Sequence, residues 1–166
     1  FEGEHEWPTP VAIDAGMDFF DRDYATQGVL RVRANGAGLA AGLMAEARTG
    51  NNGMTKEFHI VGGLDMQAGL EYYTTMFRAL KAELPHVHIK ALTAVEIAHI
   101  ARIEKMGWSE VLAALKEAGL DTMPGGGAET FSAAVREEIA RKKLGAADYI
   151  GVHRAAHALG IRSNST

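Results

Sequence analysis

From Lys56 onward, strand-like runs alternate with helix-like runs, and this alternation limits the folds that the chain can adopt. The strand-like runs are Glu57–Val61, Val87–Leu92, Gly119–Met123 and Ile161–Thr166. After the first run, apolar residues recur at intervals of three and four, as on one face of a helix: Leu70, Tyr73, Phe77, Leu80 and Leu84. Strand–helix units of this kind predict right-handed crossovers between parallel strands.

Local signals also predict the later helices. Thr93 followed by Glu96 matches a capping box, so a helix should begin there. Ser109 is predicted to cap another, shorter helix. Arg136 is expected to form ion pairs on a helix surface, and reaching the site is the alternative. Two further apolar faces are predicted by spacing alone: Phe131, Val135 and Ile139, and then Tyr149, Val152, Ala156 and Leu159.

These units predict an α/β fold, an incomplete TIM-type (β/α) barrel with parallel strands and outer helices, because four units are too few for a closed barrel of eight. Residues 56–166 form this partial barrel, while residues 1–55 form a poorly defined segment with a strand pattern at 28–33 and a helix pattern at 37–48. In such folds the ligand site lies at the carboxyl ends of the strands. The corresponding segments here are 62–65, 90–96, 124–129 and 163–166.

Composition removes several classes of function. The chain has 166 residues, of which 47% are hydrophobic, and a net charge of −4, so it can bury a core and carries no basic footprint for nucleic acid. It contains no run long enough to span a membrane. It has no cysteine, which excludes disulfides, a thiol nucleophile and a thiolate-held metal. We expect a cytoplasmic protein with a small-molecule substrate and neither a nucleic-acid nor a membrane partner.

A glycine run follows the third strand-like run. Pro124 precedes Gly125, Gly126 and Gly127, and Ala128 with Glu129 is predicted to open a helix. Glycines allow backbone N–H groups to approach a ligand, and a helix N-terminus favours phosphate or carboxylate. A glycine-rich turn without a ligand fits the same spacing.

Four segments together resemble one family: FHIVGGL (58–64), HIKALTAVEI (88–97), GLDTMPGGGAETF (119–131) and VHRAAHALGIRSNST (152–166). They resemble the radical S-adenosylmethionine enzymes of the futalosine route to menaquinone, and among these the aminofutalosine synthases. The related cyclase of the same pathway is an alternative. The resemblance covers about residues 56–166 and not residues 1–55.

The resemblance implies a transferase that uses S-adenosylmethionine and a 4Fe–4S cluster held by a Cys-x-x-x-Cys-x-x-Cys loop, with flavodoxin or ferredoxin as the reducing partner. A 5′-deoxyadenosyl radical would add to the carboxyvinyl ether of 3-hydroxybenzoate to give aminofutalosine. This chain has no cysteine, so it cannot bind the cluster in that way and is expected to be inactive alone. The sequence is also compatible with a phosphate-binding barrel or with a non-catalytic fragment.

The resemblance and the pattern together predict the site residues. Gly62, Gly63, Gly126 and Glu129 are expected to bind S-adenosylmethionine, and Lys90, Thr93 and Glu96 to bind the substrate. Lys90 is favoured for a carboxylate because strands buried on both faces seldom carry lysine. Glu96 has an alternative role in the capping box, and Glu129 an alternative role in a first helical turn. No metal site is predicted, although His153 and His157 stand at the spacing of a zinc pair.

Overall fold

One sheet organises the chain in the computed structural model, which describes residues 12–13, 17–20, 29–34, 56–66, 68–140 and 143–164. The sheet has seven strands in sequence order: β1 (Ala12–Ile13), β2 (Met17–Phe20), β3 (Val29–Ala34), β4 (Glu57–Gly62), β5 (His88–Ala91), β6 (Thr122–Met123) and β7 (Arg162–Ser163). The pairs β1–β2 and β2–β3 are antiparallel. From β3 to β7 every pair is parallel.

The parallel arrangement confirms the predicted strand–helix repeat. Glu57 pairs with His88 and Ile60 with Ala91, so β4 and β5 run in the same direction, as expected for a crossover through a helix. The strand pattern at 28–33 corresponds to β3. The helix pattern at 37–48 lies outside the described residues, as do most of residues 1–55.

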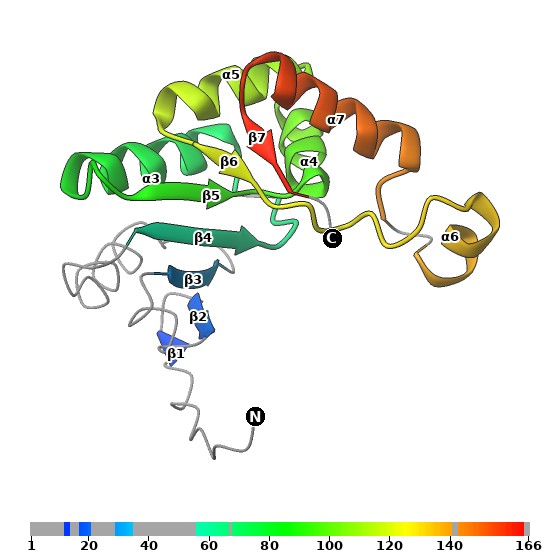
Figure 1. The fold of residues 1–166 in the computed structure, drawn as a ribbon, viewed down its shortest axis with the longest axis horizontal. Helices are drawn as coiled ribbons and strands as arrows, with labels where there is room; N and C mark the ends of the chain where they lie inside the picture. Colours follow the sequence, from blue (N-terminus) through cyan, green and yellow to red (C-terminus); the bar gives the residue numbers. More distant parts are fainter. Residues whose placement is uncertain are drawn as a thin grey trace.

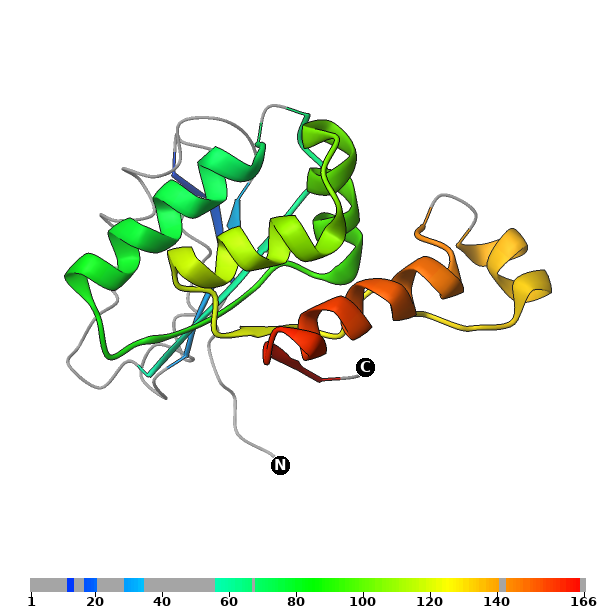
Figure 2. The same ribbon diagram turned by 90° about the horizontal axis from the view of Figure 1, so that it is seen from above.

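Four helices cover one face of β4–β7: α3 (Leu70–Glu83), α4 (Ala94–Glu104), α5 (Trp108–Ala118) and α7 (Ala146–Ala158). Figures 1 and 2 show these helices side by side above the strands, with α6 (Ala133–Ile139) standing apart. None of the described helices combines the length and the apolar character needed to cross a membrane. The arrangement is a layered α/β unit compatible with part of a barrel.

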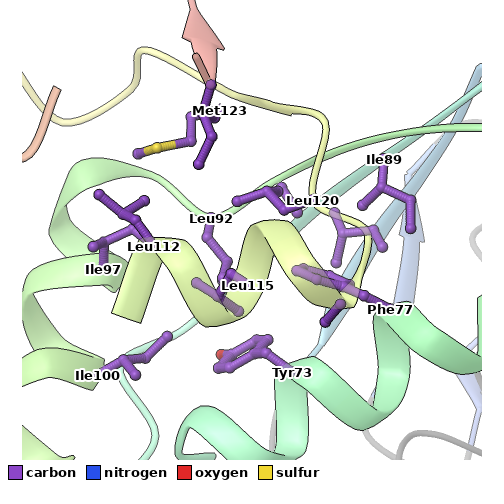
Figure 3. Packing of buried hydrophobic residues seen from close by; sticks show 14 of the residues in the cluster. Tyr73, Phe77, Ile89, Leu92, Ile97, Ile100, Leu112, Leu115, Leu120 and Met123 are labelled. Atoms are coloured by element: carbon purple, nitrogen blue, oxygen red, sulfur yellow. The ribbon is translucent and has the colours of Figure 1, made fainter. Parts of the chain in front are cut away.

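The core lies between this helical layer and the sheet, where alternate strand residues are buried. Phe58 and Ile60 of β4, Ile89 and Ala91 of β5, and Met123 of β6 are almost fully buried. They pack with helix residues that include Tyr73, Phe77, Ile97, Ile100, Leu112 and Leu115 (Figure 3). Each fully buried large apolar side chain contributes about 1.5–3 kcal/mol.

The opposite face of the sheet is only half-buried in the described residues. His59, His88, Lys90 and Thr122 alternate with the core residues and retain partial exposure. The premise that Lys90 stands on a strand buried on both faces is therefore wrong for this part of the chain. One layer of helices buries one face, which is why the strands alternate.

Three local predictions were wrong. α5 begins at Trp108, not after Ser109, because the Glu110 carboxylate accepts the N–H of its N-cap Gly107 at 2.7 Å. The predicted strand at 119–123 shortens to β6, since Gly119 forms the left-handed end of α5. α6 begins at Ala133, not at Ala128.

The apolar face predicted for α6 also differs from the prediction. Phe131, Val135 and Ile139 are 55%, 42% and 68% exposed. Their spacing is helical, but no described element packs against them over most of their surface. Spacing can predict a shared face, whereas burial depends on which element lies opposite.

Candidate functional site

Three loops meet where β4, β5 and β6 end. A Cβ at Gly126 would lie 3.6 Å from Cγ2 of Thr93, at the start of α4. A Cβ at Gly127 would lie 2.7 Å from Cγ2 of Val95, in the first turn of the same helix. The glycine run therefore lies against the N-terminus of α4, at the carboxyl-end edge of the parallel strands, where α/β folds bind ligands.

Glu96 links two of these loops. Its Oε1 accepts the N–H of Gly62 at 2.7 Å, and its Oε2 accepts the N–H of Thr93 at 2.7 Å and the Thr93 hydroxyl at 2.8 Å. The Glu96 N–H in turn donates to Thr93 Oγ1 at 3.4 Å, which completes the predicted capping box. The carboxylate thus joins the end of β4 to the start of α4.

Burial and hydrogen bonding have opposite effects on the pKa of the Glu96 carboxyl group. Burial raises the pKa of its carboxyl group, and the donors from Thr93 and Gly62 offset part of that rise. Both carboxylate oxygens already have partners, as has the Thr93 hydroxyl. In this structure Glu96 and Thr93 act as positioning residues for the loops.

Gly62 and Gly63 differ in their surroundings. The N–H of Gly62 is occupied by Glu96, so it is not free for a ligand. A Cβ at Gly63 would meet no atom of the described residues within 4 Å, which leaves space beside the backbone there. Of the two glycines, Gly63 is the one whose backbone has space for contact with a ligand.

The glycine run does not lead directly into a helix, which differs from the prediction. Gly127 has φ +99°, a left-handed conformation that Val95 and backbone sterics reserve for glycine. α6 starts only at Ala133, so the helix that follows the glycines in the sequence does not begin at them. The expectation that Ala128 and Glu129 open a helix at the glycines is therefore wrong, and the helix N-terminus next to the glycines is that of α4.

Glu129 lies in the irregular segment between the glycines and α6. It has φ +55°, and its exposed carboxylate pairs with Lys143. The hydrogen bond from Lys143 lowers the pKa of Glu129. Its predicted alternative role in a first helical turn is wrong, because no helix begins there.

Arg136 is buried next to the segment that follows the glycines, which differs from the surface position that the sequence favoured. The prediction placed it on the helix surface, yet it is 7% exposed. Its guanidinium donates to the carbonyl of Thr130 at 2.7 Å and to the carbonyls of Ala128 and Leu144. It therefore ties the segment after the glycines to the start of the next helix.

A ring cluster on α7 adjoins the glycine loop from the other side. The Tyr149 hydroxyl donates to the Gly125 carbonyl at 2.5 Å, and its ring lies 4.6 Å from that of His153. His157 Nε2 is hydrogen-bonded to Ser163 Oγ at 2.9 Å. These rings border a cavity of about 350 Å³. The helical i, i+4 spacing of 149, 153 and 157 is the signal that could have found this cluster.

His153 is buried, and neither of its ring nitrogens has a hydrogen-bond partner among the residues that the structure describes. Burial, together with the neighbouring His157, lowers the pKa of His153. Among the described residues no group of three or more His, Cys, Asp or Glu side chains is arranged to hold a metal ion. With no cysteine in the sequence, the residues present do not fit a 4Fe–4S cluster.

Lys90 stands apart from the loops, on the half-buried face of β5. It borders a pocket of about 250 Å³ with residues of β6 and β7: Thr122, Met123, Arg162, Ser163 and Asn164. The structure thus groups Gly63, Gly126, Thr93 and Glu96 at the strand ends and places Lys90 on the sheet surface.

Comparison with known proteins finds relatives with named activities. No family model matches the chain. The aminodeoxyfutalosine synthase of Thermus thermophilus is 49% identical over 110 residues, which is 66% of this chain and 30% of the relative. This chain is similar to aminodeoxyfutalosine synthase. The Streptomyces coelicolor aminodeoxyfutalosine synthase is 41% identical over 123 residues, 74% of this chain and 31% of the relative.

A second group of relatives carries a different name. The 5-amino-6-(D-ribitylamino)uracil–L-tyrosine 4-hydroxyphenyl transferase 1 of Methanosarcina acetivorans is 35% identical over 156 residues, 93% of this chain and 42% of the relative. That alignment is longer than residues 56–166, so it includes part of residues 1–55. The chain spans less than half the length of these relatives, including the aminodeoxyfutalosine synthases.

Proposed function

We propose that residues 56–166 are the cofactor- and substrate-binding part of an aminodeoxyfutalosine synthase. The reaction would be that of a radical S-adenosylmethionine transferase in menaquinone biosynthesis, joining a 5′-deoxyadenosyl group to the carboxyvinyl ether of 3-hydroxybenzoate. The single observation that carries the proposal is the 49% identity to the Thermus thermophilus enzyme. The parallel strands, whose loops meet at one edge, support a partial (β/α) barrel as the scaffold.

S-adenosylmethionine would be held by the loops at the strand ends. Gly63 has space beside its backbone. A Cβ at Gly126 would lie 3.6 Å from its nearest neighbour, so the backbone of Gly126 is also accessible to a ligand. Glu129, exposed on the same loop, would accept a hydrogen bond from a ribose hydroxyl. When bound, S-adenosylmethionine supplies the 5′-deoxyadenosyl group. Thr93 and Glu96 would fix the mouth of the site, and Lys90 would hold a substrate carboxylate.

The cluster is not assigned to this chain, because the sequence supplies no thiolate. We therefore expect the 166-residue chain, reconstituted anaerobically with iron and sulfide, to bind no 4Fe–4S cluster and to form no aminofutalosine. A flavodoxin or ferredoxin as electron donor and a cytoplasmic setting are expected of the longer enzyme only.

A chimera tests the proposal. The aligned segment of the Thermus thermophilus enzyme would be replaced by residues 56–166 of this chain, leaving the host's cysteines in place. We expect the chimera to form aminofutalosine from S-adenosylmethionine and the carboxyvinyl ether of 3-hydroxybenzoate. A folded chimera with a loaded cluster and no product would contradict the proposal.

A second candidate is transfer of a 4-hydroxyphenyl group, as named for the Methanosarcina relative. The longer alignment, 93% of this chain, favours it. The same segment placed in the Methanosarcina acetivorans enzyme distinguishes the two. Activity restored only in that host would replace the first proposal with the second.

A further inference from the structure

Three strands place one residue each in a single row across the open face of the sheet. Lys90 pairs in register with Thr122, and Thr122 pairs with Arg162. Figure 1 shows β5, β6 and β7 lying side by side. Partners in register on parallel strands point to the same face. The neighbours Ile89, Ala91 and Met123 are buried under the helices, so this row points to the opposite face.

The two ends of this row are cationic, and they border the same pocket of about 250 Å³. The remaining lining residues are Thr122, Met123, Ser163 and Asn164. These residues carry two hydroxyls and one amide, and none of the described lining residues is acidic. Two strand spacings, about 10 Å, separate the backbones of Lys90 and Arg162.

Lys90 and Arg162 differ from two other lysines of the chain, which have anionic partners. Lys81 is 2.6 Å from Asp121, and Lys143 pairs with Glu129. In the part of the chain that the structure describes, no carboxylate lies within ion-pair distance of Lys90 or Arg162. Lys90 is half-buried and Arg162 is exposed. Two cations that border one pocket repel one another, and an anion between them relieves that repulsion.

From this geometry we infer that Lys90 and Arg162 together form a carboxylate-binding site on the open face of the sheet. Arg162 presents a planar fork that can bind both oxygens of a carboxylate, and Lys90 adds a point charge from the other side. Asn164 can donate a further hydrogen bond, whereas the hydroxyls of Thr122 and Ser163 are already hydrogen-bonded to His88 and His157. The substrate class, an aromatic carboxylate, rests on the proposed function; the pairing of the two cations does not.

Arg162 thereby joins the predicted site as the partner of Lys90. The sequence alone predicts only Lys90 at a substrate carboxylate. Arg162 stands on the strand that follows the α7 cluster, and only the register of β5, β6 and β7 brings it to the same row.

Titration of the complete 166-residue chain tests the site without any cluster or turnover. The probes are 3-hydroxybenzoate and inorganic phosphate, and the readouts are the dissociation constant and the amide resonances of residues 90, 122 and 162. We expect 3-hydroxybenzoate to shift these resonances and to bind more tightly than phosphate. Lys90→Gln and Arg162→Gln should each weaken binding about tenfold, as loss of a charged hydrogen bond does.

Matched variants keep the test decisive. Arg78→Gln removes the same charge from an exposed position on α3 and should leave binding unchanged. Arg162→Lys retains the charge but not the fork, and should weaken binding less than Arg162→Gln. Thermal unfolding of each variant shows whether it has folded, and only folded variants are compared.

Wild-type affinity in folded Arg162→Gln would overturn the inference, as would phosphate binding as tightly as 3-hydroxybenzoate. These outcomes are separate from the chimera experiment. An inactive chimera alongside carboxylate binding by the chain would remove the proposed function and leave the site in place. An active chimera, together with a chain that binds no carboxylate, would support the proposed function and remove the carboxylate site.

Discussion

The carboxylate of Glu96 joins two segments that lie far apart in the sequence, because Gly62 donates its N–H to Oε1 at 2.7 Å. The second carboxylate oxygen is held by Thr93. A side chain that first reads as a helix cap therefore also fixes the end of β4. Removing it should loosen both loops of the candidate site together.

Glu96→Gln should lower the free energy of unfolding by about 1–3 kcal/mol, although the two side chains have nearly the same shape. One end of the amide is a donor and would face N–H groups of Gly62 or Thr93, leaving a donor unsatisfied. Urea denaturation measures the change. Glu104→Gln is a suitable control, since Glu104 is exposed and accepts one N–H, that of Leu70. Equal losses in both variants would contradict the special role of Glu96.

The glycines of the loop should respond differently to the same substitution. Gly127→Ala should destabilise the protein by about 1–2 kcal/mol, because φ is +99° and the new Cβ would lie 2.7 Å from Val95. Gly126→Ala should change stability by no more than about 0.5 kcal/mol, since its nearest neighbour is 3.6 Å away. Thermal unfolding distinguishes them.

If Gly126 contacts S-adenosylmethionine, as proposed, Gly126→Ala should weaken cofactor binding without loss of stability. Equilibrium dialysis with labelled S-adenosylmethionine measures this. Unchanged affinity in a stable variant would remove Gly126 from the cofactor site.

Arg136 should keep the segment after the glycines, residues 128–140, in a fixed conformation. Arg136→Met retains much of the buried stem but removes the donors to Ala128, Thr130 and Leu144. We expect faster amide hydrogen exchange at residues 128–140, with little change in the helices α3 and α4. Exchange followed by mass spectrometry resolves the two regions. Uniformly faster exchange would mean that Arg136 supports the whole fold.

Core packing should dominate global stability. Leu115 is fully buried between the helices and the sheet, so Leu115→Ala should cost about 2–5 kcal/mol. Leu64 is 52% exposed, and Leu64→Ala should cost no more than about 0.5 kcal/mol. Guanidinium denaturation of both variants checks the contrast. Similar losses would mean that Leu64 packs in solution.

His153 should make stability depend on pH. Its folded pKa lies below its ordinary value of 6.5, so the unfolded chain binds this proton more readily. As pH falls below about 6.5 and passes the folded pKa, the free energy of unfolding should decrease, by no more than about 1.4 kcal/mol per pH unit for one proton. His153→Leu should flatten this part of the pH profile. A profile as steep as that of the wild type would assign the effect to another group.

The sequence by itself determined the elements whose signals are local. The three- and four-residue spacing from Leu70 to Leu84 predicted α3, and Thr93 with Glu96 predicted the start of α4. The parallel pairing of β4 with β5 followed from the helix between them. These features depend on neighbouring residues, so they can be derived without knowing what lies opposite.

Only the tertiary structure decided which groups meet and which face is covered. Phe131 and Ile139 share a helical spacing but remain exposed, while Arg136, predicted at the surface, is buried beneath backbone carbonyls. Lys90 and Arg162 reach one row through the register of three strands. Register and packing are set by the burial of the whole core, and no local pattern encodes where distant segments come together.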